Sequence, residues 1–99
     1  MAVRELPIPP DADTAAEGCE ILRGWLIDER LQCSILPGAF PEPFGWGILL
    51  ADVAHHIANA LAEAPGVNRD QVLRDIARAF NVEMRTPTDE HSGEYVEPK

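Results

Sequence analysis

Apolar and polar residues alternate with two different periods along the chain, and the change of period separates a predicted β-hairpin from two predicted helices. Between residues 19 and 36 the period is two, which is typical of strands. From Trp46 to Glu63 the period is that of a helix, and a second helical pattern begins at Asn68. The pattern predicts an α+β fold of the order β-β-α-α, with a hairpin-based antiparallel sheet packed on two antiparallel helices.

The predicted hairpin has a polar tip at Asp28-Glu29-Arg30, and the length of its loop leaves the strand register open. A three-residue loop places Ile27 opposite Leu31, whereas a two-residue loop at Asp28-Glu29 pairs Leu26 with Leu31. Either register produces one consistently apolar face, so the pattern of hydrophobic residues does not choose between them.

A two-stranded hairpin is barely stable alone, so it must pack on the helices, gain a third strand or pair with the edge of another protomer. Residues 5–9 or 82–86 could supply the third strand. In both registers Cys19 lies far from Cys33, which argues against a disulfide. Residues 1–10 contain no apolar core of a secretory signal, so a cytoplasmic protein with reduced thiols is expected.

The first predicted helix is apolar around most of its circumference, because its polar residues share one narrow arc: Asp52, His55, His56, Asn59 and Glu63. The apolar arc divides into a bulky stripe and an adjacent stripe of small residues. So much apolar surface requires cover on two sides, from the rest of the chain or from a second chain. The predicted interaction surface contains Trp46, Gly47, Ala51, Ala54 and Ala58.

The second predicted helix begins at Asn68, where Gln71 follows at the spacing of a capping box. The short connection at Ala64-Pro65-Gly66 makes the two helices antiparallel neighbours. Three segments are therefore expected: an extended arm over 1–18, one globular domain over 19–84, and a flexible acidic tail over 85–99, with disorder at both termini.

Acidic residues dominate the charge of the chain, and most of them lie near its ends. The formal net charge is -9, of which residues 1–20 carry -4 and residues 85–99 carry -2. Phosphate backbones and anionic membranes attract proteins of the opposite sign. Nucleic acid and membrane surfaces are therefore not expected as partners.

Several runs in the chain resemble a small bacterial family that is known as a domain of unknown function. The most specific run is Trp46-Gly47-Ile48-Leu49-Leu50-Ala51-Asp52-Val53-Ala54-His55-His56, and weaker similarity lies in residues 6–10, 20–26, 37–40 and 87–89. The resemblance covers roughly residues 5–89. The hairpin tip departs from the glycine-rich tip associated with the family. The resemblance implies a small cytoplasmic bacterial protein, and it implies no activity, cofactor or catalytic residue.

The histidines of the first helix are the candidates for chemistry. Asp52 and His56 are four residues apart with His55 beside them, so they could hold a metal ion or form an acid–base pair. No motif places a third ligand or a nucleophile, and the same stripe is typical of a half-exposed helix. We therefore expect no cofactor and favour a noncatalytic interaction or regulatory module, with a homodimer or an unknown protein as partner. The alternative is a small metal- or ligand-binding enzyme that uses the Asp/His stripe.

Overall fold

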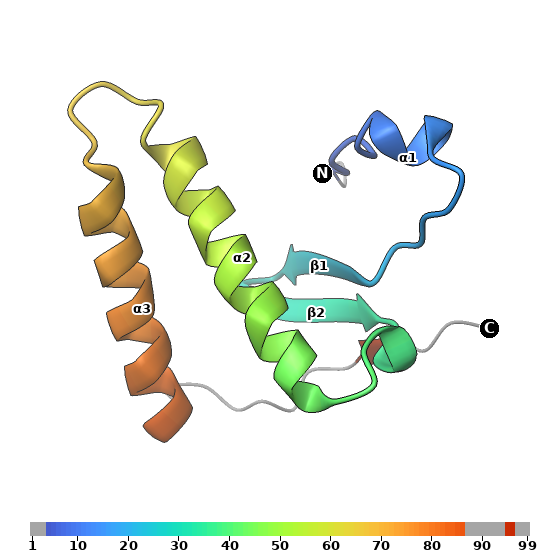
Figure 1. The fold of residues 1–99 in the computed structure, drawn as a ribbon. Helices are drawn as coiled ribbons and strands as arrows, with labels where there is room; N and C mark the ends of the chain where they lie inside the picture. Colours follow the sequence, from blue (N-terminus) through green and yellow to red (C-terminus); the bar gives the residue numbers. More distant parts are fainter. Residues whose placement is uncertain (1–3, 87–94, 97–99) are drawn as a thin grey trace. The chain divides into compact units, whose positions relative to one another are not determined.

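The computed structural model describes residues 4–86 and 95–96 of the chain (Figure 1). Its two strands followed by two long helices confirm the predicted β-β-α-α order. The chain divides into two compact units, Met1–Pro37 with Glu94–Lys99 and Gly38–Gly93, and each unit is described by itself. The elements are α1 (Asp11–Thr14), β1 (Leu22–Ile27), β2 (Arg30–Ile35), the short 3-10 helix η1 (Pro37–Ala39), α2 (Pro43–Leu61), α3 (Arg69–Arg85) and β3 (Tyr95–Val96).

Strands β1 and β2 pair through a two-residue turn, which decides between the two predicted registers. Leu26 lies opposite Leu31, and the turn residues Asp28 and Glu29 have φ angles of 51° and 67°. Two consecutive left-handed residues form the tight turn whose twist matches that of the flanking strands. One face of the hairpin is therefore wholly apolar, and it consists of Leu22, Gly24, Leu26, Leu31, Cys33 and Ile35.

A third strand is present, and it comes from neither of the two segments considered for it. Strand β3 comes from Tyr95–Val96 and pairs with β2 in parallel, with Cys33 opposite Tyr95. Residues 5–9 form no strand, because prolines at 7 and 9 have no N–H to donate to a ladder. Residues 82–86 do not join the sheet, because helix α3 continues to Arg85.

Helix α2 begins after Glu42, with Pro43 at its start, where a missing N–H costs no hydrogen bond. Ahead of it the ring of Phe40 meets the ring of Trp46 edge to face, with centroids 5.2 Å apart. A Cβ built on Gly45 would lie 2.9 Å from three carbon atoms of Phe40. The lack of a side chain at Gly45 therefore lets Phe40 pack against the first turn of the helix.

Helix α3 begins as predicted at Asn68, whose side chain accepts a hydrogen bond of 2.9 Å from the backbone N–H of Gln71. The reciprocal half of a capping box is absent. The Gln71 side chain instead donates to Asp75 at 3.0 Å and accepts from Arg74 at 2.9 Å. The N-terminus of α3 is therefore held by one cap and a network along its surface.

Helices α2 and α3 contact each other and run antiparallel, joined by the short loop at the top of Figure 1. Ala58 of α2 is completely buried, and no other residue in the described ranges is. Ala54 and Ala62, four residues to either side on the same face, are half-buried. The core of the helical unit is therefore small and lies between the loop-proximal halves of the two helices.

The predicted division into an arm, a domain and a tail stays a prediction. Within the arm, residues expected to be irregular form one helical turn, α1, at Asp11–Thr14. The predicted tail over 85–99 lies mostly outside the described residues, although Tyr95–Val96 within it form β3.

Adding a methyl group at Gly45 should weaken the fold. We expect Gly45→Ala to lower the free energy of unfolding by about 1–3 kcal/mol, because the added Cβ overlaps Phe40. Urea denaturation monitored by circular dichroism measures the change. Gly38→Ala is the matched control, since a Cβ there meets nothing within 4 Å. Equal stabilities of the two variants would show that the contact with Phe40 is not tight.

Relieving the left-handed turn should stabilise the hairpin. We expect Glu29→Gly to raise the free energy of unfolding by about 1 kcal/mol, because glycine adopts a positive φ without steric cost. Glu29→Ala removes the same carboxylate but keeps a Cβ, so it should leave stability nearly unchanged. Thermal denaturation of both variants compares them. A gain from alanine as large as that from glycine would contradict the backbone explanation.

Candidate functional site

The predicted metal-binding residues all lie exposed on α2. Asp52, His55 and His56 fall on one arc of the helix, and the Nδ1 atom of His55 lies 2.8 Å from the backbone carbonyl oxygen of Ala51. One ring nitrogen of His55 is thus engaged by its own helix. Within residues 4–86 and 95–96, no group of three or more His, Cys, Asp or Glu side chains is placed to share a metal ion. The arrangement therefore supplies two neighbouring imidazoles and a carboxylate on one exposed helix face.

Asn59, one turn beyond His55, has a structural partner. Its side-chain oxygen accepts a short hydrogen bond from Arg69, the first residue of α3, and Arg69 also pairs with Asp70 at 3.4 Å. This contact joins the C-terminal half of α2 to the start of α3. The polar arc therefore serves at least partly to hold the two helices together.

The stripe of small residues on α2 divides into a covered part and an open part. Ala58 is fully buried and Ala54 half-buried, and α3 is the element that contacts α2. Ala51 and Gly47, farther from the loop on the same face, are exposed, and a Cβ built on Gly47 meets nothing within 4 Å. Within this chain Ala58 is therefore covered where α2 and α3 pack, while Gly47 and Ala51 remain accessible.

The bulky stripe of α2 is more exposed than a core stripe would be. Its aliphatic members that lie at the surface are Leu50, Val53, Ile57 and Leu61, with exposed fractions from 37% to 52%. Trp46, the remaining residue of the predicted interaction surface, is half-buried against Phe40. The apolar circumference of α2 is therefore covered on the small-residue side near the loop and accessible elsewhere.

Helix α3 also exposes two large apolar side chains that were not predicted to belong to an interaction surface. Phe80 is 47% exposed and Met84 is 70% exposed. Both lie on the same face of α3 as Leu73 and Ile76, which are half-buried. The spacing 73, 76, 80 and 84 was the signal that could have identified them, because it extends one apolar face to the end of the helix.

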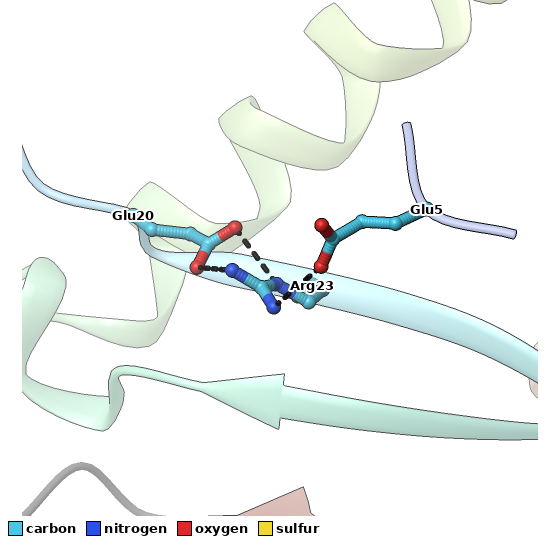
Figure 2. Close-up of polar contacts among 3 residues, drawn as sticks. All are labelled: Glu5, Glu20 and Arg23. Atoms are coloured by element: carbon cyan, nitrogen blue, oxygen red, sulfur yellow. Dashed lines mark hydrogen bonds and ion pairs between the residues drawn. The ribbon is translucent and has the colours of Figure 1, made fainter. Parts of the chain in front are cut away.

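In the other unit, Arg23 of β1 links two acidic side chains (Figure 2). Its guanidinium donates to both carboxylate oxygens of Glu20, at 3.0 and 2.7 Å, and to Glu5 at 3.4 Å. The hydrogen bonds from Arg23 to Glu20, then the charge of Glu20 and more weakly that of Glu5, raise the pKa of Arg23 above its usual value. The contact ties the extended arm at Glu5 to β1, but all three side chains are solvent-exposed.

Removing the charge of Arg23 should loosen the arm. We expect Arg23→Gln to lower the backbone order parameter at Glu5, because an exposed pair holds its partners only weakly and no longer acts once one charge is gone. NMR relaxation of the backbone amides measures the effect. Glu17→Gln is the control, since it removes a charge from the same arm outside this contact. An unchanged order parameter in Arg23→Gln would show that the ion pair does not restrain the arm.

The fold is shared with a solved structure. The chain is similar to a protein named "putative pyruvate dehydrogenase" from the photosynthetic bacterium Rhodopseudomonas palustrus CGA009, with 32% identity, a TM-score of 0.73, and coverage of 94% of this chain and 95% of that one. No curated protein matches the chain. Across residues 4–86 and 95–96, none of the helices combines the length and apolar character needed to span a membrane.

The sequence matches a family of domains of unknown function, as the Trp-Gly-Ile-Leu-Leu-Ala-Asp run of α2 predicted. A family model described as a domain of unknown function matches residues 5–88, which is most of the chain and includes both strands of the hairpin and both long helices. The chain therefore belongs to the family of domains of unknown function DUF5076.

Proposed function

We propose that the chain is a noncatalytic protein-interaction module that acts as a homodimer. The observation that carries the proposal is the imbalance between its buried and exposed apolar residues. Ala58 alone is completely buried within the described ranges, whereas many large apolar side chains of the helical unit are exposed. Water contact with apolar surface is unfavourable, so a partner that covers this surface stabilises both chains.

Exposed apolar side chains are numerous on the helical unit. Ten large apolar side chains of the helical unit are between 37% and 75% exposed: Phe44, Ile48, Leu50, Val53, Ile57, Leu61, Val67, Phe80, Val82 and Met84. These side chains lie on more than one side of the helices, since at about 100° per residue Phe44 is on a different side of α2 from Val53. One partner would therefore cover only part of this surface.

A second copy of the chain is the partner that needs no further assumption. Two antiparallel helices cannot enclose a core by themselves, but two such pairs can form a four-helix arrangement with a shared apolar centre. Symmetric dimers are also the commonest assemblies of soluble proteins. The exposed faces of α2 and α3 supply apolar surface on each copy.

The proposed homodimer predicts the mass of the purified protein. We expect native mass spectrometry and light scattering to give twice the chain mass across a micromolar dilution series, because a second copy that covers exposed apolar side chains removes them from water. The protein is prepared without chelator, so that a bound metal ion would be detected as added mass.

Other masses would contradict the proposal in different ways. A bare monomer at every concentration would overturn the homodimer. A monomer that carries a stoichiometric metal or small molecule would favour the alternative role of Asp52, His55 and His56 in ligand binding. Oxidation of pyruvate by the purified chain would favour the activity in the name of the similar structure.

A further inference from the structure

Strand β1 lies at the edge of the sheet. The strand order is β1-β2-β3, so β1 has a neighbouring strand on one side only (Figure 1). Native proteins usually guard such an edge with proline, lysine or a bulge, because its unpaired N–H and C=O groups can pair with another chain. Strand β1 contains neither proline nor lysine, and its register with β2 is continuous. Its outer edge is therefore suited to strand pairing.

The hairpin register shows which backbone groups of β1 point outward. Hydrogen-bonded and non-hydrogen-bonded residues alternate along an antiparallel pair. The bond of 3.0 Å from the N–H of Leu36 to the carbonyl oxygen of Ile21 fixes this alternation. Leu22, Gly24 and Leu26 consequently take the non-hydrogen-bonded positions, and their N–H and C=O groups point away from β2. In the part of the chain that the structure describes, these outward groups have no hydrogen-bond partner.

Resting on the proposed homodimer, we propose that the two copies meet along β1, whose outer edges pair antiparallel about a two-fold axis at Gly24. In this register Gly24 lies opposite Gly24 of the second copy, and Leu22 lies opposite Leu26. No other symmetric antiparallel register pairs all three outward-pointing residues of β1. Each such pair exchanges two backbone hydrogen bonds. The edge is thus complementary to itself, as a two-fold interface requires.

The side chains in this register also suit each other. Leu22 meets Leu26 on the apolar face of the hairpin. On the opposite face Arg23, whose side chain is 42% exposed, meets the ring of Trp25, and aromatic rings attract cations. An axis moved to Arg23 would place two like charges directly opposite each other, which is unfavourable. An axis moved to Trp25 would leave Leu22 without a partner.

Pairing of two copies also stabilises the hairpin unit. A sheet of two full strands is barely stable alone, and β3 adds only the two residues Tyr95–Val96. Within the described ranges the completely buried residue, Ala58, belongs to the helical unit. Joined along β1, the hairpins of two copies form one continuous sheet in which both β1 strands are interior. The same two-fold axis relates the helical units, so this pairing and contact between the helical units belong to one dimer.

Substitutions of Gly24 test the shared ladder. We expect Gly24→Pro to raise the dimer dissociation constant at least about tenfold, because proline removes the N–H that each copy donates at the axis. The hairpin itself loses no ladder bond, since this N–H points away from β2. Gly24→Ala keeps the N–H, and its Cβ would lie 3.6 Å from Leu31, an ordinary contact, so the dimer should stay intact. Dilution series followed by light scattering measure both constants.

Amide hydrogen exchange of the wild-type chain provides a measurement that does not depend on a variant. We expect the N–H groups of Leu22, Gly24 and Leu26 to be protected in the dimer and to lose this protection on dilution to the monomer. The N–H groups of Arg23 and Trp25 face β2, so they should stay protected at both concentrations and serve as the internal control. NMR of the backbone amides resolves the alternation residue by residue.

The outcomes separate this inference from the proposed function. A dimer that survives Gly24→Pro, or whose Gly24 N–H exchanges freely, would overturn the pairing along β1 and keep the homodimer. Loss of the dimer in Gly24→Ala would do the same, because that substitution leaves the ladder intact. Protection of the three outward amides in a monomer would overturn the second copy as the partner of β1. A wild-type chain that is monomeric at every concentration, with these amides unprotected, would overturn the homodimer itself.

Discussion

Packing of α3 against the face of α2 that carries the buried Ala58 is the interaction on which the helical unit depends. Alanine side chains four residues apart leave α2 with a nearly smooth strip, and α3 packs against it. The contact gains dispersion energy from many atoms at short distance, but it buries little apolar area for each residue. The bulky side chains of α2 are consequently left at the surface, where Leu50 and Ile57 are both more than two-fifths exposed.

Helix α2 differs from an ordinary surface helix because the residue that it buries, Ala58, is small, while several of its bulky residues are exposed. A helix with one apolar stripe buries it against its own chain and shows polar residues elsewhere. Helix α2 has its polar residues on one arc. Within that arc Asn59 accepts a hydrogen bond from Arg69, and the His55 ring is hydrogen-bonded to the carbonyl oxygen of Ala51. The rest of its surface is largely apolar, and much of it is exposed.

Local features of the sequence predicted the elements well. Pro43 marks the start of α2 because its missing N–H costs no hydrogen bond there. Asn68 marks the start of α3 because its side chain accepts a hydrogen bond from the N–H of Gln71. Both signals act within one helical turn, so they can be identified from the local sequence. The hairpin register was left open, because both registers have an apolar face and the Asp28-Glu29 turn lacks the asparagine and glycine that usually mark it. Only the φ angles of the turn resolve it.

Features that depend on distant segments escaped prediction. Strand β3 is two residues long and joins a neighbour sixty positions earlier in the chain, so no local period identifies it. The division of the small stripe at Ala54 depends on where α3 lies against α2, and the spacing of alanines does not contain that information. Surface exposure of Phe80 likewise follows from packing, although its place on the apolar face was readable.

The parallel pairing of β3 with β2 has a consequence for how the chain opens. The pairing of Cys33 with Tyr95 closes a loop that contains both long helices. For a flexible loop of about sixty residues the length-dependent closure entropy costs about 3–4 kcal/mol, whereas each ladder hydrogen bond contributes about 1 kcal/mol net. Two paired residues barely offset that cost. Release of β3 is therefore a low-energy excursion from the native state, and it exposes the outer edge of β2 while the β1–β2 ladder stays intact.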